Sequence, residues 1–132
     1  MVQNLKLGDL QLAILRVLWA AGEATVAEVH GKLHPERGLA LTTIATMLRK
    51  LEEKGAVRHR EHGRQFIYRA AVVADQVQSS MVGDLVERLF DGDPVQLVHH
   101  LLEEGEIDLS ELDALRAAVA AARSREKRGG RS

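Results

Sequence analysis

Apolar residues recur at helical spacing in three segments of the first half of the chain, residues 9–21, 26–33 and 41–54. A period near 3.6 residues predicts three amphipathic helices, each with one apolar face. The apolar positions are Leu10, Ile14, Val17 and Leu18 in the first segment, Val26, Val29 and Leu33 in the second, and Leu41, Ile44, Met47, Leu48 and Leu51 in the third.

Local signals mark where these helices begin and end. Thr25 and Glu28 have the spacing of a capping box, which predicts the start of the second helix. Pro35 and Gly38 are expected to break the chain after residue 33. Gly55 is expected to stop the third helix.

Two short segments after the third helix have the character of strands. Residues 56–60 and 65–70 flank a polar turn at 61–64, and Gly63 inside that turn is a hairpin signal. Three helices followed by a hairpin is the order of a winged helix-turn-helix domain, with 56–70 as its wing. The predicted fold is therefore mainly α with a small β-hairpin.

The second half returns to helical periodicity. Helices are predicted over 75–90, 95–102 and 109–122, and Asp108 with Glu111 forms a second capping box before the last of them. A segment of fewer than 50 residues carries more large apolar side chains than it can bury on itself. The predicted contact residues are Val77, Met81, Leu85, Leu89, Leu97, Val98, Leu101, Leu112 and Leu115.

A second copy of the chain could bury this apolar patch against its own, which predicts a homodimer. Packing of these helices back onto the winged helix is the alternative. The expected organisation is a DNA-binding domain at 1–74, a C-terminal helical dimerisation module at 75–122 and a disordered basic tail at 123–132.

Charge is distributed unevenly along the 132 residues, although the net charge is only −1. Residues 1–74 carry 11 Lys and Arg against 7 Asp and Glu, whereas residues 75–132 carry 7 against 12. This split favours contact between a polyanion and the first half only, although scattered surface charge would also account for it.

Other totals exclude several classes of protein. The chain has no cysteine, which excludes a disulfide framework, a thiolate nucleophile and a cysteine-bound metal. It has neither an apolar run of about 20 residues nor the layout of a signal peptide, so we expect no membrane contact and a cytoplasmic location.

The outer face of the third helix has the side chains expected of a helix that recognises DNA bases. Threonine side chains near its start can meet base edges and thymine methyl groups, and later cations can reach phosphates or guanine. A solvated polar face, or a winged helix used only for protein contacts, is the alternative. The candidate DNA-binding residues are Thr42, Thr43, Ala45, Thr46, Arg49 and Lys50 on the helix, with Arg58 and Arg64 in the hairpin, where Arg60 and Arg69 could also lie along the adjacent backbone or minor groove.

Catalysis and cofactor binding have little support in the sequence. There is no glycine-rich phosphate loop and no suggestive Ser, His and Asp order, so we predict that the protein is not an enzyme and needs no cofactor. His30 and His34 have a spacing that can bind zinc, but Pro35 is expected to place His34 at a fraying helix end. The sequence therefore predicts no metal site.

Two stretches resemble the penicillinase repressor family, which includes the β-lactamase and methicillin-resistance repressors and related copper-responsive repressors. They are Leu39-Ala40-Leu41-Thr42-Thr43-Ile44-Ala45-Thr46-Met47-Leu48-Arg49-Lys50-Leu51 and Gly63-Arg64-Gln65-Phe66-Ile67-Tyr68. The resemblance extends over roughly residues 7–120. It implies a homodimeric transcriptional repressor that binds double-stranded DNA at an inverted-repeat operator with TACA and TGTA half-sites.

The same resemblance implies roles for particular residues. Thr42, Thr43, Ala45 and Thr46 would lie nearest the bases, although some relatives have lysine and arginine at positions 42 and 45. In β-lactam-responsive relatives a sensor protease pathway leads to cleavage of an Asn–Phe bond, where this chain has His100–Leu101. The copper-responsive relatives use a C-terminal cysteine cluster, which this chain lacks. The sequence therefore does not identify the signal that would release the repressor from DNA.

Overall fold

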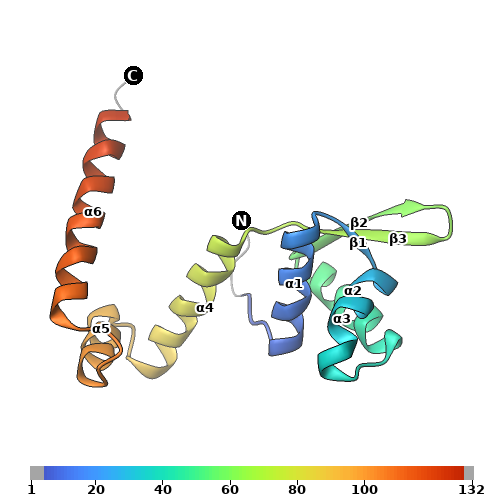
Figure 1. The fold of residues 1–132 in the computed structure, drawn as a ribbon, viewed down its shortest axis with the longest axis horizontal. Coiled ribbons are helices and arrows are strands. Elements are labelled where there is room, and N and C mark those ends of the chain that lie inside the picture. The colour runs from blue at the N-terminus through green and yellow to red at the C-terminus, as the bar shows by residue number, and fades with distance from the viewer. Residues whose placement is uncertain (1–4, 130–132) are drawn as a thin grey trace. The chain divides into compact units, whose positions relative to one another are not determined.

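A computed structural model describes residues 5–129, and this part of the chain contains six helices and three short strands (Figure 1). In chain order the elements are α1 (Asp9–Ala21), β1 (Ala24–Thr25), α2 (Val26–Arg37), α3 (Leu41–Glu53), β2 (Val57–His62), β3 (Gln65–Ala70), α4 (Ala74–Leu89), α5 (Pro94–Glu103) and α6 (Leu109–Gly129). Three helices precede the hairpin, as the sequence predicted. None of the described helices is long and apolar enough to cross a membrane.

The strands form one antiparallel sheet in the order β1-β3-β2. β1 was not predicted from the sequence, because two residues are too few to show an alternating pattern. It pairs Ala24 with Tyr68 and Thr25 with Ile67. The wing is thus anchored at its base by a strand that directly precedes α2.

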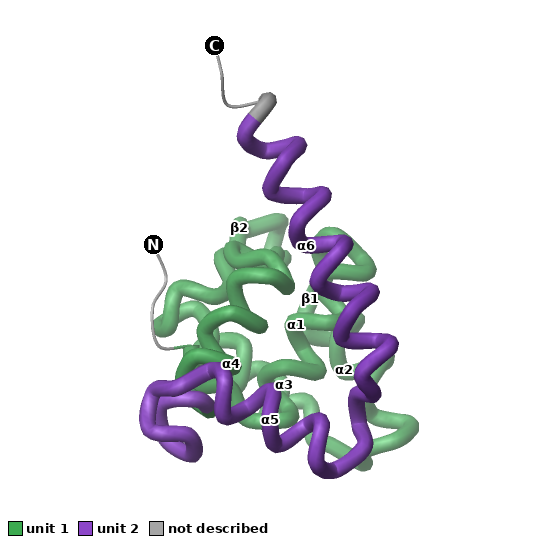
Figure 2. The backbone as a smooth tube through the Cα atoms, turned by 90° about the vertical axis from the view of Figure 1, so that its left-hand side faces the viewer, with its two compact units in different colours: residues 1–85 green, residues 86–132 purple. Residues whose placement is uncertain are grey.

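The first compact unit, residues 1–85, is the green part of the chain in Figure 2. Its buried side chains form one hydrophobic cluster, which is mainly aliphatic. α1, α2 and α3 each direct an apolar face into it, and β2 and β3 close one side. Trp19 packs against this cluster, and its indole N–H donates to the Val72 carbonyl at 2.8 Å, which joins α1 to the segment after the wing. The largest side chains with almost no exposed surface are Ile14, Leu15, Leu18, Val29, Ile44, Leu48, Leu51, Val57 and Val77.

The predicted end of α2 was wrong. The helix does not stop at Leu33 but includes Pro35 and continues to Arg37. Gly38 adopts a left-handed φ of 58°, and its N–H donates to the His34 carbonyl at 2.8 Å. This cap closes the last turn, so the loss of one helical hydrogen bond at Pro35 does not end the helix.

The wing is also longer than predicted. β2 runs to His62 instead of ending at residue 60, and the turn shrinks to Gly63 and Arg64. Gly63 has a φ of 62°, whereas Arg64 is not among the described residues with positive φ. Glycine at the first central position of a two-residue hairpin loop is typical of a type II′ turn, whose twist suits the flanking strands.

α4 was expected to belong entirely to the dimerisation module, and this expectation needs correction. Val77 is only 2% exposed and lies in the core of the first unit, and Met81 packs against the same cluster. The Leu5 N–H also donates to the Ser80 hydroxyl at 2.9 Å. The division between compact units falls after Leu85 and not at residue 74. For this first part of α4, the alternative of packing onto the winged helix holds.

The second unit, residues 86–132, has almost no interior of its own. Among its described residues only Val86 is a buried apolar side chain, and α5 contains none. α6 extends to Gly129, where the sequence suggested a disordered tail from residue 123; residues 130–132 lie outside the described part. The apolar faces of α5 and α6 are therefore largely exposed in the single chain, which is typical of a surface that binds a partner.

Candidate nucleic-acid interface

α3 separates its apolar and polar residues onto opposite faces. Ile44, Leu48 and Leu51 are fully buried. On the other face Thr42, Arg49 and Lys50 are exposed, and Thr43, Ala45 and Thr46 are partly buried. The buried side fixes the rotation of the helix about its axis, so the polar side is presented to solvent as a rigid row.

The N-terminal turn of α3 lies next to the tip of the wing. Arg64, Gln65 and Phe66 line a shallow pocket with Leu41, the first residue of α3, and with residues 25–27 at the start of α2. Ala40 caps α3 without a side-chain hydrogen bond. The first turn therefore keeps backbone N–H groups that can bond water or a phosphate.

The register of the hairpin gathers arginine on one face of the wing. Arg58 of β2 lies directly opposite Arg69 of β3, and Arg60 lies opposite Ile67 on the same face. Like charges directly across an antiparallel pair are destabilising. Together with Arg64 at the turn, this face is a strip of positive charge that an anion would stabilise.

A contact between α3 and the wing fixes their relative orientation. The Glu52 carboxylate lies 2.7 Å from Nδ1 of His59 on β2. The His59 ring in turn stacks on Phe66, with ring centroids 4.1 Å apart and an interplanar angle of 19°. This chain of contacts runs from the last turn of α3 across both strands of the wing.

A second contact joins the wing to the loop before β1. The Arg60 guanidinium donates to the Glu23 carboxylate at 2.9 Å. This hydrogen bond and the charge of Arg60 lower the pKa of Glu23 below its ordinary value, and Glu23 correspondingly raises the pKa of Arg60. A carboxylate with a lowered pKa stabilises the fold above its unfolded pKa and loses this effect as the pH falls through the folded value. Both groups are therefore charged at neutral pH, and the ion pair between the wing and the loop before β1 is intact there.

Burial, together with the nearby negative charge of Glu52, raises the pKa of Tyr68 above its ordinary value. Tyr68 is only 5% exposed and belongs to the core cluster. Its phenol stays neutral, so it serves as packing for the wing and not as an anionic group. Phe66, by contrast, is 43% exposed at the wing tip.

The structure therefore brings α3 and the wing together but spreads the eight candidate DNA-binding residues over two surfaces. Sequence reasoning named Arg60 and Arg69 beside that set as hairpin cations that could lie along the DNA, but it missed Glu52 and His59. The strand register adds that Arg69 lies directly opposite Arg58, because the turn at Gly63 has two residues. Nothing local identifies the Glu52–His59 contact.

The predicted dimerisation residues differ widely in exposure. Val77 is buried and Met81 partly so, whereas Leu85, Leu89 and Leu115 are 40%, 70% and 52% exposed. Val98 is 37% exposed, and Leu97, Leu101 and Leu112 are partly buried. The large exposed apolar residues that the prediction omitted in this half are Val82, Val95, Leu109 and Val119.

The capping box before α6 is confirmed. The Glu111 N–H donates to the Asp108 carboxylate at 2.8 Å, and the Asp108 N–H donates to the Glu111 side chain at 3.1 Å. Hydrogen bonds from the Glu111 N–H and the Ser110 hydroxyl lower the pKa of Asp108. The ionised cap satisfies the first N–H groups of a helix that is otherwise exposed to solvent.

Comparison with known proteins agrees with this geometry. Residues 7–121 match the penicillinase repressor family. The chain belongs to this family. Members of the penicillinase repressor family are transcriptional repressors and not enzymes, which confirms the resemblance and the non-enzymatic class predicted from the sequence.

Individual members of the penicillinase repressor family are similar over nearly their whole length. The transcriptional regulator BlaI of Mycobacterium tuberculosis is 33% identical over 123 residues, covering 91% of this chain and 87% of the relative. The penicillinase repressor of Bacillus licheniformis is 25% identical, covering 92% and 95%. The solution structure of the DNA-binding domain of the repressor BlaI superposes with a TM-score of 0.51 at 30% identity, covering 56% of this chain and 90% of that domain. The winged-helix fold is thereby confirmed.

Proposed function

We propose that the chain is a homodimeric repressor that binds an inverted-repeat operator through α3 and the wing. The cross-strand pair of Arg58 and Arg69 carries this proposal, because a like-charged pair held on one rigid face is unfavourable until an anion lies between or across it. A duplex backbone supplies phosphates along such a strip. Two similar proteins support DNA as the partner. One is the DNA-binding domain of the repressor BlaI, and the other is a penicillinase repressor.

The residues of the interface divide by chemistry. Thr42, Thr43, Ala45 and Thr46, at the N-terminal end of α3, face the bases, since that end of a recognition helix usually enters the major groove. The cations Arg49, Lys50, Arg58 and Arg64 bind phosphates and set the register of the protein on the duplex. The Glu52–His59 contact holds α3 and the wing in one fixed arrangement, in which both can contact the duplex at the same time.

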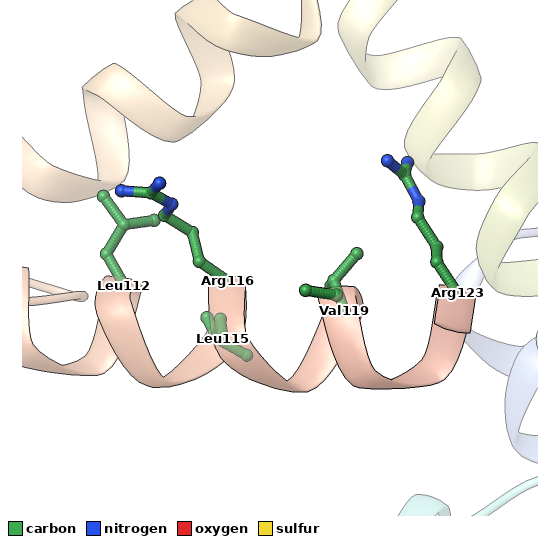
Figure 3. A pocket seen from close by; sticks show the side chains of 6 residues that line it. Leu112, Leu115, Arg116, Val119 and Arg123 are labelled. Atoms are coloured by element: carbon green, nitrogen blue, oxygen red, sulfur yellow. The ribbon is translucent and has the colours of Figure 1, made fainter. Parts of the chain in front are cut away.

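The second unit supplies the homodimer. A stripe of Leu112, Leu115 and Val119 follows α6, and Figure 3 shows Leu112 and Val119 projecting from the same side of the helix as Arg116 and Arg123. These side chains line a shallow hollow, and every residue that lines it belongs to α6. A second copy that packs its own α6 here would bury both stripes, as a two-fold interface requires.

Release from DNA would follow from loss of this dimer. The His100–Leu101 bond, the candidate for cleavage, lies within α5, where His100 is exposed and Leu101 partly buried. A protease needs extended backbone, so α5 must unwind locally before cleavage. Cutting there would detach α6 from the DNA-binding domain.

Binding to a duplex tests the proposal directly. We expect the full chain to bind an inverted repeat with TACA and TGTA half-sites more tightly than a scrambled duplex, in fluorescence anisotropy. Affinity should fall steeply between about 50 and 200 mM salt, because phosphate contacts release counterions. Equal affinity for both duplexes, with no salt dependence, would favour the alternative of a protein-binding winged helix, for which the exposed Leu41 and Phe66 would be the natural contacts.

Two single substitutions separate base reading from phosphate binding. Thr46→Ala should relax base preference at one position of each half-site, whereas Arg64→Ala should weaken binding to every sequence alike and reduce the salt slope by about one unit per subunit. Both are measured by anisotropy on operators with single base changes. A uniform loss from Thr46→Ala as well would show that α3 does not read the bases.

A further inference from the structure

Two histidines of α2 converge on one backbone oxygen. Nε2 of His30 lies 2.8 Å from the Leu39 carbonyl oxygen, and Nδ1 of His34 lies 3.1 Å from the same atom. The two rings stack with centroids 4.8 Å apart and an interplanar angle of 23°. The sequence argued against a metal here because Pro35 was expected to end α2, but the helix continues to Arg37 and holds both rings on one face.

The described residues contain no group of three His, Cys, Asp or Glu side chains placed to hold a metal ion. The arrangement at α2 differs because its third donor is a carbonyl oxygen. Two imidazole nitrogens and one oxygen form a mixed donor set that suits Cu²⁺, Ni²⁺ or Zn²⁺. We propose that His30, His34 and the Leu39 carbonyl form a binding site for a divalent transition-metal ion.

The two histidines supply the nitrogen ligands, and the carbonyl oxygen lies beside them. The separations of 2.8 and 3.1 Å are hydrogen-bond lengths, with each ring N–H directed at the oxygen. An ion with bonds of about 2.1 Å to all three atoms therefore requires each ring to turn away from the oxygen. Cu²⁺, Ni²⁺ and Zn²⁺ all accept such a donor set, with water in the remaining positions.

Metal binding requires a change of tautomer but no net proton loss from neutral histidines. Without metal, each ring nitrogen donates its N–H to the Leu39 carbonyl. With metal, the lone pairs of Nε2 of His30 and Nδ1 of His34 face the ion, and each proton moves to the other nitrogen of its ring. Because protonated imidazole has no lone pair to offer, protons compete with the ion, and the affinity should be lower in acidic solution.

The site spans the turn of the helix-turn-helix. His30 and His34 lie on α2, and Leu39 directly precedes Ala40, the cap of α3. A bound ion would join the end of α2 to the start of the proposed recognition helix. It would stabilise the folded state by mass action, since the unfolded chain does not hold these three atoms together.

Calorimetric titration of the untagged, full-length protein with Ni²⁺ above about pH 7 tests the site. We expect one ion per chain, at least about tenfold weaker binding for His30→Ala and for His34→Ala, and a Ni²⁺-dependent rise in thermal stability that both of these single variants lose. The control is the double variant His99→Ala and His100→Ala, two exposed histidines of α5, which should bind as the unchanged protein does.

A second measurement does not depend on substitutions. Substoichiometric Cu²⁺ should broaden the ring NMR signals of His30 and His34 and leave those of His59 and His62 sharp. Ni²⁺ affinity unchanged in His30→Ala, or broadening spread equally over all histidines, would overturn the proposal.

Discussion

Replacing Leu115 and Val119 of α6 with glutamate is expected to lower the affinity for a full inverted-repeat operator by about 100- to 10,000-fold. Both side chains are about half exposed in the single chain, and the proposed dimer would bury them. Two charges in that contact would separate the subunits and remove the gain in effective concentration that two linked DNA-binding domains provide. Fluorescence anisotropy gives the affinity, and light scattering gives the mass in solution.

The matched control places the same two charges on the opposite side of α6. Ala117 and Ala121 lie roughly 140–180° around the helix from the Leu112 direction, and both are exposed. Ala117→Glu with Ala121→Glu should stay dimeric and keep its operator affinity. If Leu115→Glu with Val119→Glu still had the mass of a dimer, the α6 stripe would not be the subunit contact.

Leu48→Ala is expected to lower the free energy of unfolding by about 2–5 kcal/mol. Leu48 is fully buried at the centre of α3, and truncation removes its burial and leaves a cavity among rigid neighbours. Because domains of this kind are stable by only about 5–15 kcal/mol, the loss would be a large part of the total. Urea unfolding followed by circular dichroism measures it as a lower midpoint.

Lys50→Ala is the control, two residues further along the same helix and exposed. It should change the stability by no more than about 0.5 kcal/mol, while weakening DNA binding. Equal effects of the two substitutions on the unfolding midpoint would mean that α3 is rotated about its axis relative to the structure described above.

α3 shows why part of the site could be predicted. Its two faces are encoded within 13 residues, so the spacing of apolar side chains alone defines the buried side and, by exclusion, the polar row from Thr42 to Lys50. The capping boxes at Thr25 and Asp108 were predictable for the same reason, since each joins residues three apart.

The contacts that orient the wing could not be predicted in this way. Arg60 and Glu23 are 37 residues apart, and Ala24 pairs with Tyr68 across an even longer stretch. Such contacts leave no periodic trace in the sequence, because each depends on where the intervening helices direct the chain. The two-residue strand β1 exists only through its pairing with β3.

α4 illustrates the same division within one helix. Val77, Met81, Leu85 and Leu89 follow at intervals of four residues, and this periodicity predicts a single apolar stripe. It does not say what covers each position. Val77 is 2% exposed in the core of the first unit, whereas Leu89 is 70% exposed.

The sequence by itself determined the order of helices and hairpin, the buried face of α3, the caps and the family, because these depend on residues close together in the chain. Only the tertiary structure decided which apolar faces are already covered, which arginines share a face of the wing, and that His30 and His34 converge on Leu39. Those features depend on pairing and packing between distant segments, which a local pattern of polar and apolar residues does not specify.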